Sequence, residues 1–292
     1  MTVIEEEGVL ESADGRRIGW MLRGPAGATV VGYLHGQPGS RRDLRMFAEQ
    51  TLSRYGVRML AIDRAGYGET SVVGSDRRDV ARDLLTVADH LGVVEFPLMA
   101  VSMGGVYALA LAAIAPERVT RVVMVSGHVL PYDGPEIIAG LSAAEQADVD
   151  RLLSGRTPEL EAEYAAAAAS MTEDPLGMLR ALAQGWGPRE QSLVETPMMT
   201  AVAQSVSFGL AAGHIGLLED GLRTVSPLEF ELSDVRCPVR AIHGTIDDLE
   251  PYANLERASA RLTDCAIVAL PGLGHFGPLL WPDSIFGLLS GH

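Results

Sequence analysis

The sequence predicts an α/β domain built on a mostly parallel β-sheet with helices on both faces. Apolar runs of strand length alternate with helical patterns in the amino-terminal and carboxy-terminal parts of the chain, which is the arrangement of such folds. The runs are apolar at successive positions, as strands covered on both faces require. With 292 residues, of which 47% are hydrophobic and 21% charged, the chain is long enough for one such domain carrying an insertion.

The first elements follow from turn and cap signals. Gly8–Ser12 and Arg16–Arg23 flank the turn Ala13-Asp14-Gly15 and predict a β-hairpin. A buried strand is expected at Thr29–Leu34, followed by a helix from Ser40, whose hydroxyl can cap it, to about Arg54. Further strands are expected at Arg58–Ile62, Phe96–Val101, Val119–Val125, Val239–His243 and Ala266–Leu270, and further helices at Ser75–Leu91, Gly104–Ala115, near Asn254–Leu262 and from Ser284.

The alternation stops in the middle of the chain. From about Leu130 to Ser233 no segment has a convincing strand pattern, whereas Ala-rich helical patterns such as Glu159–Met171 are present. A crossover between parallel strands needs only about a dozen residues, so this stretch is predicted to be a helical insertion. We therefore expect a sheet domain formed by residues 1–129 and 234–292, with residues 130–233 inserted after its sixth strand.

Composition excludes several classes of function. The formal net charge is −15 and the sequence pI is about 4.8, so the field of the protein repels nucleic acid and anionic membranes. The longest apolar run, Val106–Ala115, is too short to span a bilayer. The first residues are acidic where a signal peptide is basic. We therefore expect a cytoplasmic monomer or homodimer that acts on a small molecule, without nucleic-acid or membrane partners.

Neither a metal nor a cofactor is expected. The sequence contains no lysine, which excludes Schiff-base chemistry with pyridoxal phosphate and the lysine of a phosphate-binding loop. The two cysteines, Cys237 and Cys265, lack metal-ligand spacing and do not form a disulfide framework. Lysine and asparagine have AT-rich codons, and Asn254 is the only asparagine, which is typical of a GC-rich bacterial genome.

The segment Ala100-Val101-Ser102-Met103-Gly104-Gly105 carries the clearest chemical signal. It lies between a predicted buried strand and an Ala-rich helix. A serine becomes an accessible nucleophile on a sharp strand-to-helix turn, which requires small residues two positions before and after it. Ala100 and Gly104 meet this requirement. The alternative is a serine that only caps the helix, with glycines for close packing.

On these residues the chain resembles the Ser-nucleophile α/β-hydrolases, over roughly residues 8–130 and 235–290. The resemblance implies the α/β-hydrolase fold with an eight-stranded sheet, and makes the insertion a lid or cap. It also implies that an acid and then a histidine follow the serine along the chain. A serine rather than an aspartate at the turn disfavours the related haloalkane dehalogenase and epoxide hydrolase chemistries.

The sequence supplies both partners just after predicted strands, where open α/β sheets place their ligand sites. Asp247 follows Val239–His243, and His275 follows the last strand. The resemblance implies that Ser102, His275 and Asp247 form a catalytic triad, in which His275 takes the proton of Ser102 and Asp247 orients the imidazole. Other carboxylates remain possible acids, namely Asp248, Glu250 and Asp133.

The same resemblance implies two backbone donors for the oxyanion. One is the N–H of Met103, directly after the nucleophile, and the other is the N–H of Gln37 in the loop His35-Gly36-Gln37-Pro38-Gly39. His35 is expected to support this loop. The segment Asp63-Arg64-Ala65-Gly66-Tyr67-Gly68 is interpreted as architectural, with Arg64 paired to a carboxylate.

The Met, Trp and Phe residues of the insertion are candidates to line an acyl or alcohol pocket under a lid. The alternative is that they form a small core of the insertion itself. Four side chains are predicted to line the substrate pocket: His35, His128, Trp186 and Phe276. Gly185–Pro188 and Pro197 are candidate hinges of the lid.

The sequence therefore predicts a cofactor-independent serine hydrolase that cleaves a carboxylic ester of a small or medium apolar molecule through an acyl-enzyme. Three alternatives stay open. The chain partly resembles proline iminopeptidases at Gly36–Gly39 and Gly104-Gly105, and glutamates of the insertion could bind a free amine: Glu159, Glu161, Glu163 and Glu173. C–C bond hydrolases of ring-cleavage products share the scaffold and triad. A ligand-binding protein could keep the fold without catalysis.

Overall fold

An eight-stranded sheet forms the centre of the molecule, as seen in a computed structural model that describes residues 2–72, 74 and 76–290. The strand order is β1-β2-β4-β3-β5-β6-β7-β8. The β1–β2 and β2–β4 pairs are antiparallel and the other pairs are parallel, which confirms the predicted fold class. The strands are β1 (Val3–Glu11), β2 (Arg17–Pro25), β3 (Thr29–Leu34), β4 (Val57–Ile62), β5 (Phe96–Val101), β6 (Val119–Val125), β7 (Val239–Gly244) and β8 (Cys265–Leu270).

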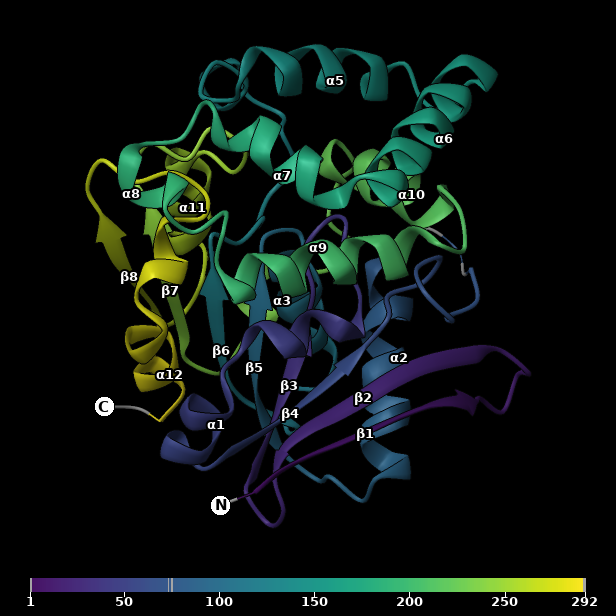
Figure 1. The fold of residues 1–292 in the computed structure, drawn as a ribbon, viewed down its shortest axis with the longest axis vertical. Helices are drawn as coiled ribbons and strands as arrows, with labels where there is room; N and C mark the ends of the chain where they lie inside the picture. Colours follow the sequence, from purple (N-terminus) through teal and green to yellow (C-terminus); the bar gives the residue numbers. More distant parts are fainter. Residues whose placement is uncertain (1, 73, 75, 291–292) are drawn as a thin grey trace.

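Helices cover both faces of the sheet because successive strand side chains alternate between two cores. In β5, Leu98 and Ala100 pack in one core with α2 (Arg77–His90), α3 (Gly104–Ile114) and α11 (Tyr252–Ser259). Met99, between them, packs in the other core with α1 (Glu49–Tyr55) and α12 (Pro282–Ser290). Both termini lie at the end of the molecule opposite the inserted helices (Figure 1).

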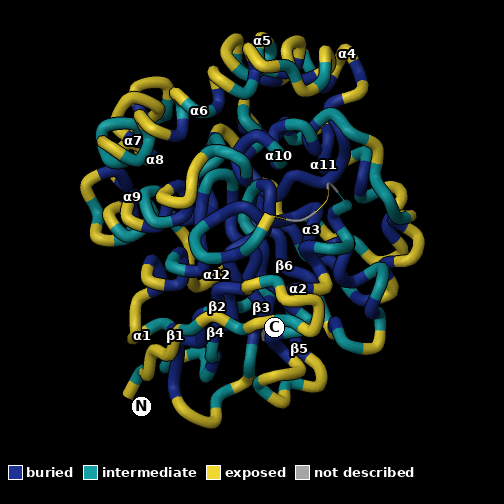
Figure 2. Tube along the Cα trace, turned by 90° about the vertical axis from the view of Figure 1, so that its right-hand side faces the viewer, coloured by how far each residue is buried: buried dark blue, intermediate teal, exposed yellow. Residues whose placement is uncertain are grey.

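The segment between β6 and β7 is helical throughout its regular elements, as predicted. Its helices lie over the carboxyl ends of the strands (Figure 1). In Figure 2 the central strands and α3 form a continuous buried trace, whereas α5, α6 and α7 have many exposed residues. The elements are α4 (Pro135–Ile138), α5 (Ala143–Leu153), α6 (Pro158–Glu173), α7 (Pro175–Ala183), α8 (Pro188–Gln191), α9 (Pro197–Leu210), α10 (Ile215–Thr224) and the 3-10 turn η2 (Leu232–Asp234).

Within the described residues, no helix is by itself long and apolar enough to cross a membrane. The pair α9 and α10 reaches the required length and composition only when taken together, and the two helices are bent by 103° at their junction.

The helix expected from Ser40 to about Arg54 is two shorter elements. A 3-10 helix, η1 (Arg41–Met46), ends at Phe47, which has an extended backbone, and α1 begins at Glu49. The Ser40 hydroxyl does cap the first piece, accepting from the N–H of Arg42 at 3.2 Å. Ser75, the predicted start of another helix, lies outside the described residues, and that helix is α2.

Candidate active site

Ser102 lies on a sharp turn between β5 and α3. Its φ of 52° is in the left-handed region, which a side chain rarely adopts and which is typical of functional turns. The turn needs glycine at position 104, because a Cβ there would lie 2.2 Å from the carbonyl oxygen of Leu34. The N–H of Ser102 donates to the carbonyl of Val125 at 3.0 Å, which fixes the turn against the end of β6.

Asp247 and His275 meet across the loops that follow β7 and β8. The Nδ1 atom of His275 lies 2.9 Å from Oδ2 of Asp247. An ionised carboxylate can only accept, so Nδ1 carries the proton and Nε2 is left as a free base. The other Asp247 oxygen accepts from the backbone N–H groups of Leu249 and Glu250, at 3.0 and 2.8 Å. Both carboxylate oxygens of Asp247 therefore have hydrogen-bond partners.

The electrostatics of this pair favour proton uptake by the histidine. Burial alone would lower the pKa of His275, but the adjacent Asp247 carboxylate outweighs it and raises the pKa above the ordinary value. Burial would likewise raise the pKa of Asp247, yet His275 and His243 hold it well below its usual range. Asp247 is therefore ionised at neutral pH and stabilises an imidazolium on its neighbour.

The other candidate acids are engaged elsewhere. Asp133 pairs with Arg257 at 2.9 Å. Glu250 accepts from the hydroxyl of Tyr132 at 2.8 Å and lies 3.0 Å from Nδ1 of His128. Asp248 is exposed. Of these carboxylates, Asp247 is the one that contacts His275.

Ser126, which the sequence reasoning missed, joins the serine and histidine loops. Its hydroxyl donates to the backbone carbonyl of His275 at 2.6 Å. The residue before it, Val125, accepts from the N–H of Ser102. Consecutive residues at the end of β6 thus hold both segments, and the positive φ of Ser126, 46°, marks the same tight geometry. A serine directly after a predicted strand was the available signal.

Ser102 and His275 line one cavity of about 390 Å³, together with Gln37 and Phe276. Much of its wall is apolar, formed by Met46, Val101, Val125, Met178, Leu179, Val202, Val206, Leu217 and Leu279. The inserted helices α5, α6, α7, α9 and α10 supply many of the remaining lining residues. The cavity therefore lies between the strand ends and the inserted helices.

Three of the four predicted pocket residues do not line this cavity. His35 and His128 are completely buried, each held by hydrogen bonds: His35 to Arg64 and Gly36, and His128 to Glu250. Trp186 packs behind Phe276, with ring centroids 4.4 Å apart. A position at a strand end or in the inserted segment does not by itself tell on which side of a loop a side chain lies, so the sequence could not place these three side chains.

Part of the cavity wall is acidic. Glu145, Asp148, Glu163 and Glu250 line it, with Arg151 among them. Burial, reinforced by Asp148 and Glu250, raises the pKa of Glu145 to about 7. Burial also raises the pKa of Asp43, on the cavity wall, to about 6. Among the described residues, no group of three His, Cys, Asp or Glu side chains is arranged to hold a metal ion.

The predicted oxyanion donors flank Ser102. Met103 immediately precedes α3, and the first N–H groups of a helix have no partner within it. The other donor, Gln37, lies in a loop that touches the serine: a Cβ on Gly36 would be 3.2 Å from Cβ of Ser102. The Gln37 side chain donates to the carbonyl of Leu217 in α10 at 3.1 Å.

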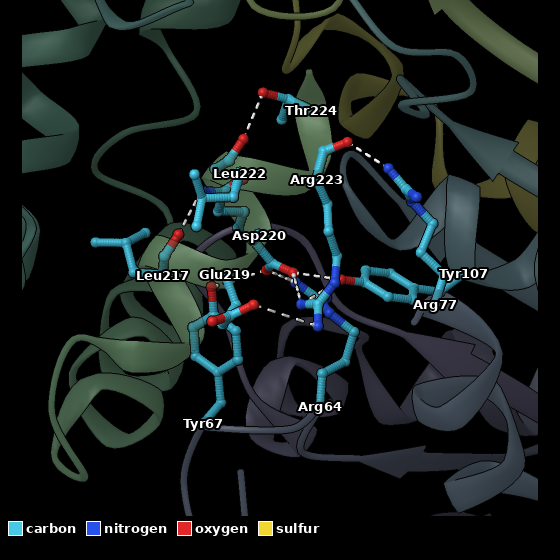
Figure 3. A network of polar contacts seen from close by, with 12 residues as sticks. Arg64, Tyr67, Arg77, Tyr107, Leu217, Glu219, Asp220, Leu222, Arg223 and Thr224 are labelled. Carbon is cyan, nitrogen blue, oxygen red and sulfur yellow. Dashed lines mark hydrogen bonds and ion pairs between the residues drawn. The ribbon is translucent and has the colours of Figure 1, made fainter. Parts of the chain in front are cut away.

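Arg64 has the carboxylate partner that the sequence suggested, and it comes from the inserted segment. Arg64 donates to Asp220 of α10, and both side chains are about 1% exposed. Asp220 also accepts from the hydroxyls of Tyr67 at 2.8 Å and Tyr107 at 2.6 Å. Figure 3 shows these groups converging on the Asp220 carboxylate.

Glu190 of α8 connects the inserted segment to the histidine loop. Its side chain is buried and accepts from the N–H of Gly274, next to His275, at 2.8 Å. No sequence pattern indicates this contact, because it joins a side chain to a distant backbone group.

Residues 29–280 match the family model described as alpha/beta hydrolase fold. Curated relatives include an sn-1-specific diacylglycerol lipase of Mus musculus, 31% identical over 106 residues, which are 36% of this chain and 34% of the relative. A 2-hydroxy-6-oxononadienedioate/2-hydroxy-6-oxononatrienedioate hydrolase of Paraburkholderia phymatum is 31% identical over 146 residues, which are 46% of this chain and 50% of the relative. The alignments span 34–50% of the length of these relatives.

Solved structures share the fold over almost the whole chain. An esterase from Exiguobacterium antarcticum has a TM-score of 0.69 at 18% identity and covers 97% of each chain. An epoxide hydrolase from Vigna radiata has a TM-score of 0.68 at 20% identity, over 99% of this chain and 98% of that one. One fold here carries different chemistries, so the reaction must be argued from the site. Because the family model spans most of the chain, the protein belongs to the α/β-hydrolase family, whose members similar to it include esterases, lipases and other hydrolases.

Proposed function

We propose that the protein is a cofactor-independent serine hydrolase that cleaves a carboxylic ester of a small or medium apolar substrate. The observation that carries the proposal is the 2.9 Å contact between His275 and Asp247, beside a cavity that both His275 and the strained Ser102 line. The apolar wall of that cavity suits an acyl chain or an apolar alcohol.

In the proposed mechanism, Nε2 of His275 takes the hydroxyl proton as Ser102 Oγ attacks the ester carbonyl. The carbonyl oxygen becomes an oxyanion, which the N–H groups of Gln37 and Met103 stabilise. Collapse breaks the C–O bond, and the imidazolium returns its proton to the leaving alcohol. Water then attacks the acyl-enzyme with His275 again as base, and the carboxylic acid leaves with Ser102 regenerated.

The direct test is covalent labelling with a fluorophosphonate probe. Wild-type protein should be labelled on Ser102, and Ser102→Ala should abolish labelling. Ser259→Ala is the matched control, because Ser259 in α11 only donates to the carbonyl of Glu256. Labelling that persists in Ser102→Ala would show that the nucleophile lies elsewhere.

An amine-binding peptidase is the second candidate, favoured by the acidic part of the cavity. Of the four glutamates that the sequence offers for binding a free amine, Glu163 lines the cavity. Its carboxylate is paired with Arg151 at 3.1 Å. Glu161 pairs instead with Arg156 at 3.2 Å. A panel of p-nitrophenyl esters of graded chain length beside a proline arylamide separates the candidates: turnover of esters alone supports the esterase. Absence of turnover on the whole panel would favour C–C bond hydrolysis or ligand binding.

A further inference from the structure

The peptide between Gly36 and Gln37 is held firmly on its carbonyl side. Both terminal nitrogens of Arg64 donate to the carbonyl of Gly36 at 3.2 Å. The backbone N–H of Arg64 donates to Nε2 of His35 at 3.0 Å, so Nδ1 of His35 carries the proton and donates to the same carbonyl at 2.8 Å. Burial and Arg64 hold the pKa of His35 well below its ordinary value, which keeps this tautomer neutral.

This carbonyl and the N–H of Gln37 belong to one peptide group. A trans peptide is planar, and its C=O and N–H point in opposite directions. Fixing the Gly36 oxygen on Arg64 therefore aims the Gln37 N–H to the side away from Arg64. Hydrogen bonds from a charged donor also polarise the peptide and strengthen its N–H as a donor.

The position of Arg64 is set in turn by α10. Asp220 accepts from Arg64 and is itself fixed by the hydroxyls of Tyr67 and Tyr107 (Figure 3). One turn earlier on the same helix face, the Leu217 carbonyl accepts from the Gln37 side chain. Helix α10 thus contacts the loop directly through the Leu217 carbonyl and indirectly through Asp220, by way of Arg64.

We infer that Asp220 is a positioning residue for the oxyanion hole. Through Arg64 it sets the direction and donor strength of the Gln37 N–H, so a side chain of the inserted segment that does not line the cavity helps to stabilise the transition state. The inference rests on the proposed function, because it assigns a purpose to that N–H. A stabilising contact between segments would not require Arg64 to bond the very carbonyl that shares a peptide with this donor.

The primary variant is Asp220→Asn, measured by turnover of an ester and by the rate of fluorophosphonate labelling. Phosphonylation also builds negative charge on an oxygen in this hole. Removing one oxyanion donor costs about 10²–10³-fold in turnover, and a misaligned donor should cost about 10–100-fold in kcat and in labelling rate. KM should stay within about twofold, since the ground-state contacts remain.

Two further variants separate positioning from simple destabilisation. Asp83→Asn removes a buried carboxylate of α2 that is paired with Arg16 at 2.8 Å. Neither residue belongs to the Gly36–Gln37 loop or to α10. This variant should lower the melting temperature while labelling proceeds at the wild-type rate. Tyr67→Phe keeps the ring and removes one hydrogen bond to Asp220, so it should slow labelling several-fold even if Asp220→Asn does not fold.

The outcomes are distinct. Wild-type labelling rates in folded Asp220→Asn, or in Tyr67→Phe if the first variant does not fold, would overturn the inference and leave Asp220 a structural residue. Slower labelling with an unchanged KM supports it. If Ser102→Ala still reacts, the proposed function itself fails, whatever these variants show.

Discussion

The Asp247 side chain determines which nitrogen of His275 is basic. Asp247→Asn keeps the shape but can present an amide N–H to Nδ1, which favours the tautomer protonated on Nε2. Turnover should fall about 10⁴-fold, the size of the corresponding effect in serine proteases. The measurement is kcat on a p-nitrophenyl ester. Asp248→Asn is the matched control, since that exposed carboxylate lies beside Asp247 in the chain. A comparable loss in the control would mean that the acid is Asp248.

The raised pKa of His275 predicts the pH dependence of activity. The proposed mechanism needs the neutral imidazole, so kcat/KM should rise with pH through the pKa of His275 in the free enzyme. Because Asp247 raises that pKa, the midpoint should lie above the ordinary value of 6.5. In Asp247→Asn the opposing effect of burial remains, so the residual activity should have its midpoint lower. A wild-type midpoint at or below 6.5 would contradict the electrostatic account.

The sequence points to candidate catalytic residues only where they come just after a predicted strand. Ser102, Asp247 and His275 each come just after a readable strand. Asp220 and Glu190 have no such mark, because Asp220 acts on Arg64, 156 positions away, and Glu190 on the backbone of Gly274, 84 positions away. Tertiary packing creates these contacts, and no local pattern encodes them.

At the scale of elements, the broken helix after Ser40 illustrates the same limit. No proline or glycine interrupts residues 41–54, so the pattern favours one helix. In the structure, Nη1 of Arg23 donates to the carbonyls of Leu44 and Phe47, at 3.0 and 2.8 Å. A distant strand thus satisfies groups that would otherwise continue the helix, and the chain turns at Phe47. The strands were predictable because a buried parallel strand is marked by its own apolar run.

Helix α9 packs backbone to backbone on the loop that runs from His35 to Gly39. A Cβ on Gly209 would lie 2.1 Å from the carbonyl oxygen of Gly39, and the Ser205 and Ser40 hydroxyls are 2.6 Å apart beside it. Gly209→Ala should therefore force the helix and loop apart, lower stability by about 2 kcal/mol and slow turnover. Thermal unfolding and ester hydrolysis measure the two effects.

Gly287→Ala is the matched control for this substitution. Gly287 is also helical, in α12, and a Cβ there meets nothing within 4 Å. An alanine in that position should raise stability by about 0.5–1 kcal/mol, because glycine loses more backbone entropy on folding. Equal stability changes in the two variants would refute the close packing of α9 on the loop.

At the scale of the whole molecule, the inserted helices do not form a uniform layer. Helices α9 and α10 contact core loops through Ser205, Gly209 and Asp220. Helix α6 packs mainly against α7, α9 and α10, and its buried residues belong to a separate small core. The stability of the segment should therefore differ along its length.

Native-state hydrogen exchange measures this difference. Amides of α9 and α10 should exchange about as slowly as those of α2 and α3, whereas amides of α6 and α7 should exchange faster through local opening. Uniform exchange across all inserted helices would contradict this division. The sequence could not predict it, since both halves of the segment are helical and apolar in similar measure.

The glycine contacts between α9, α10 and the core have a consequence for chimeras. A Cβ on Gly216 would lie 2.8 Å from the backbone of Gly66, and one on Gly209 would lie 2.1 Å from that of Gly39, so neither position has room for a side chain. An inserted segment transplanted from a relative would have to reproduce both fits, so grafts should succeed when they exchange α5–α7 and leave α9 and α10 with their host. Diversification of substrate range would then be confined to the outer helices, while the inner pair changes only together with the loops beneath it.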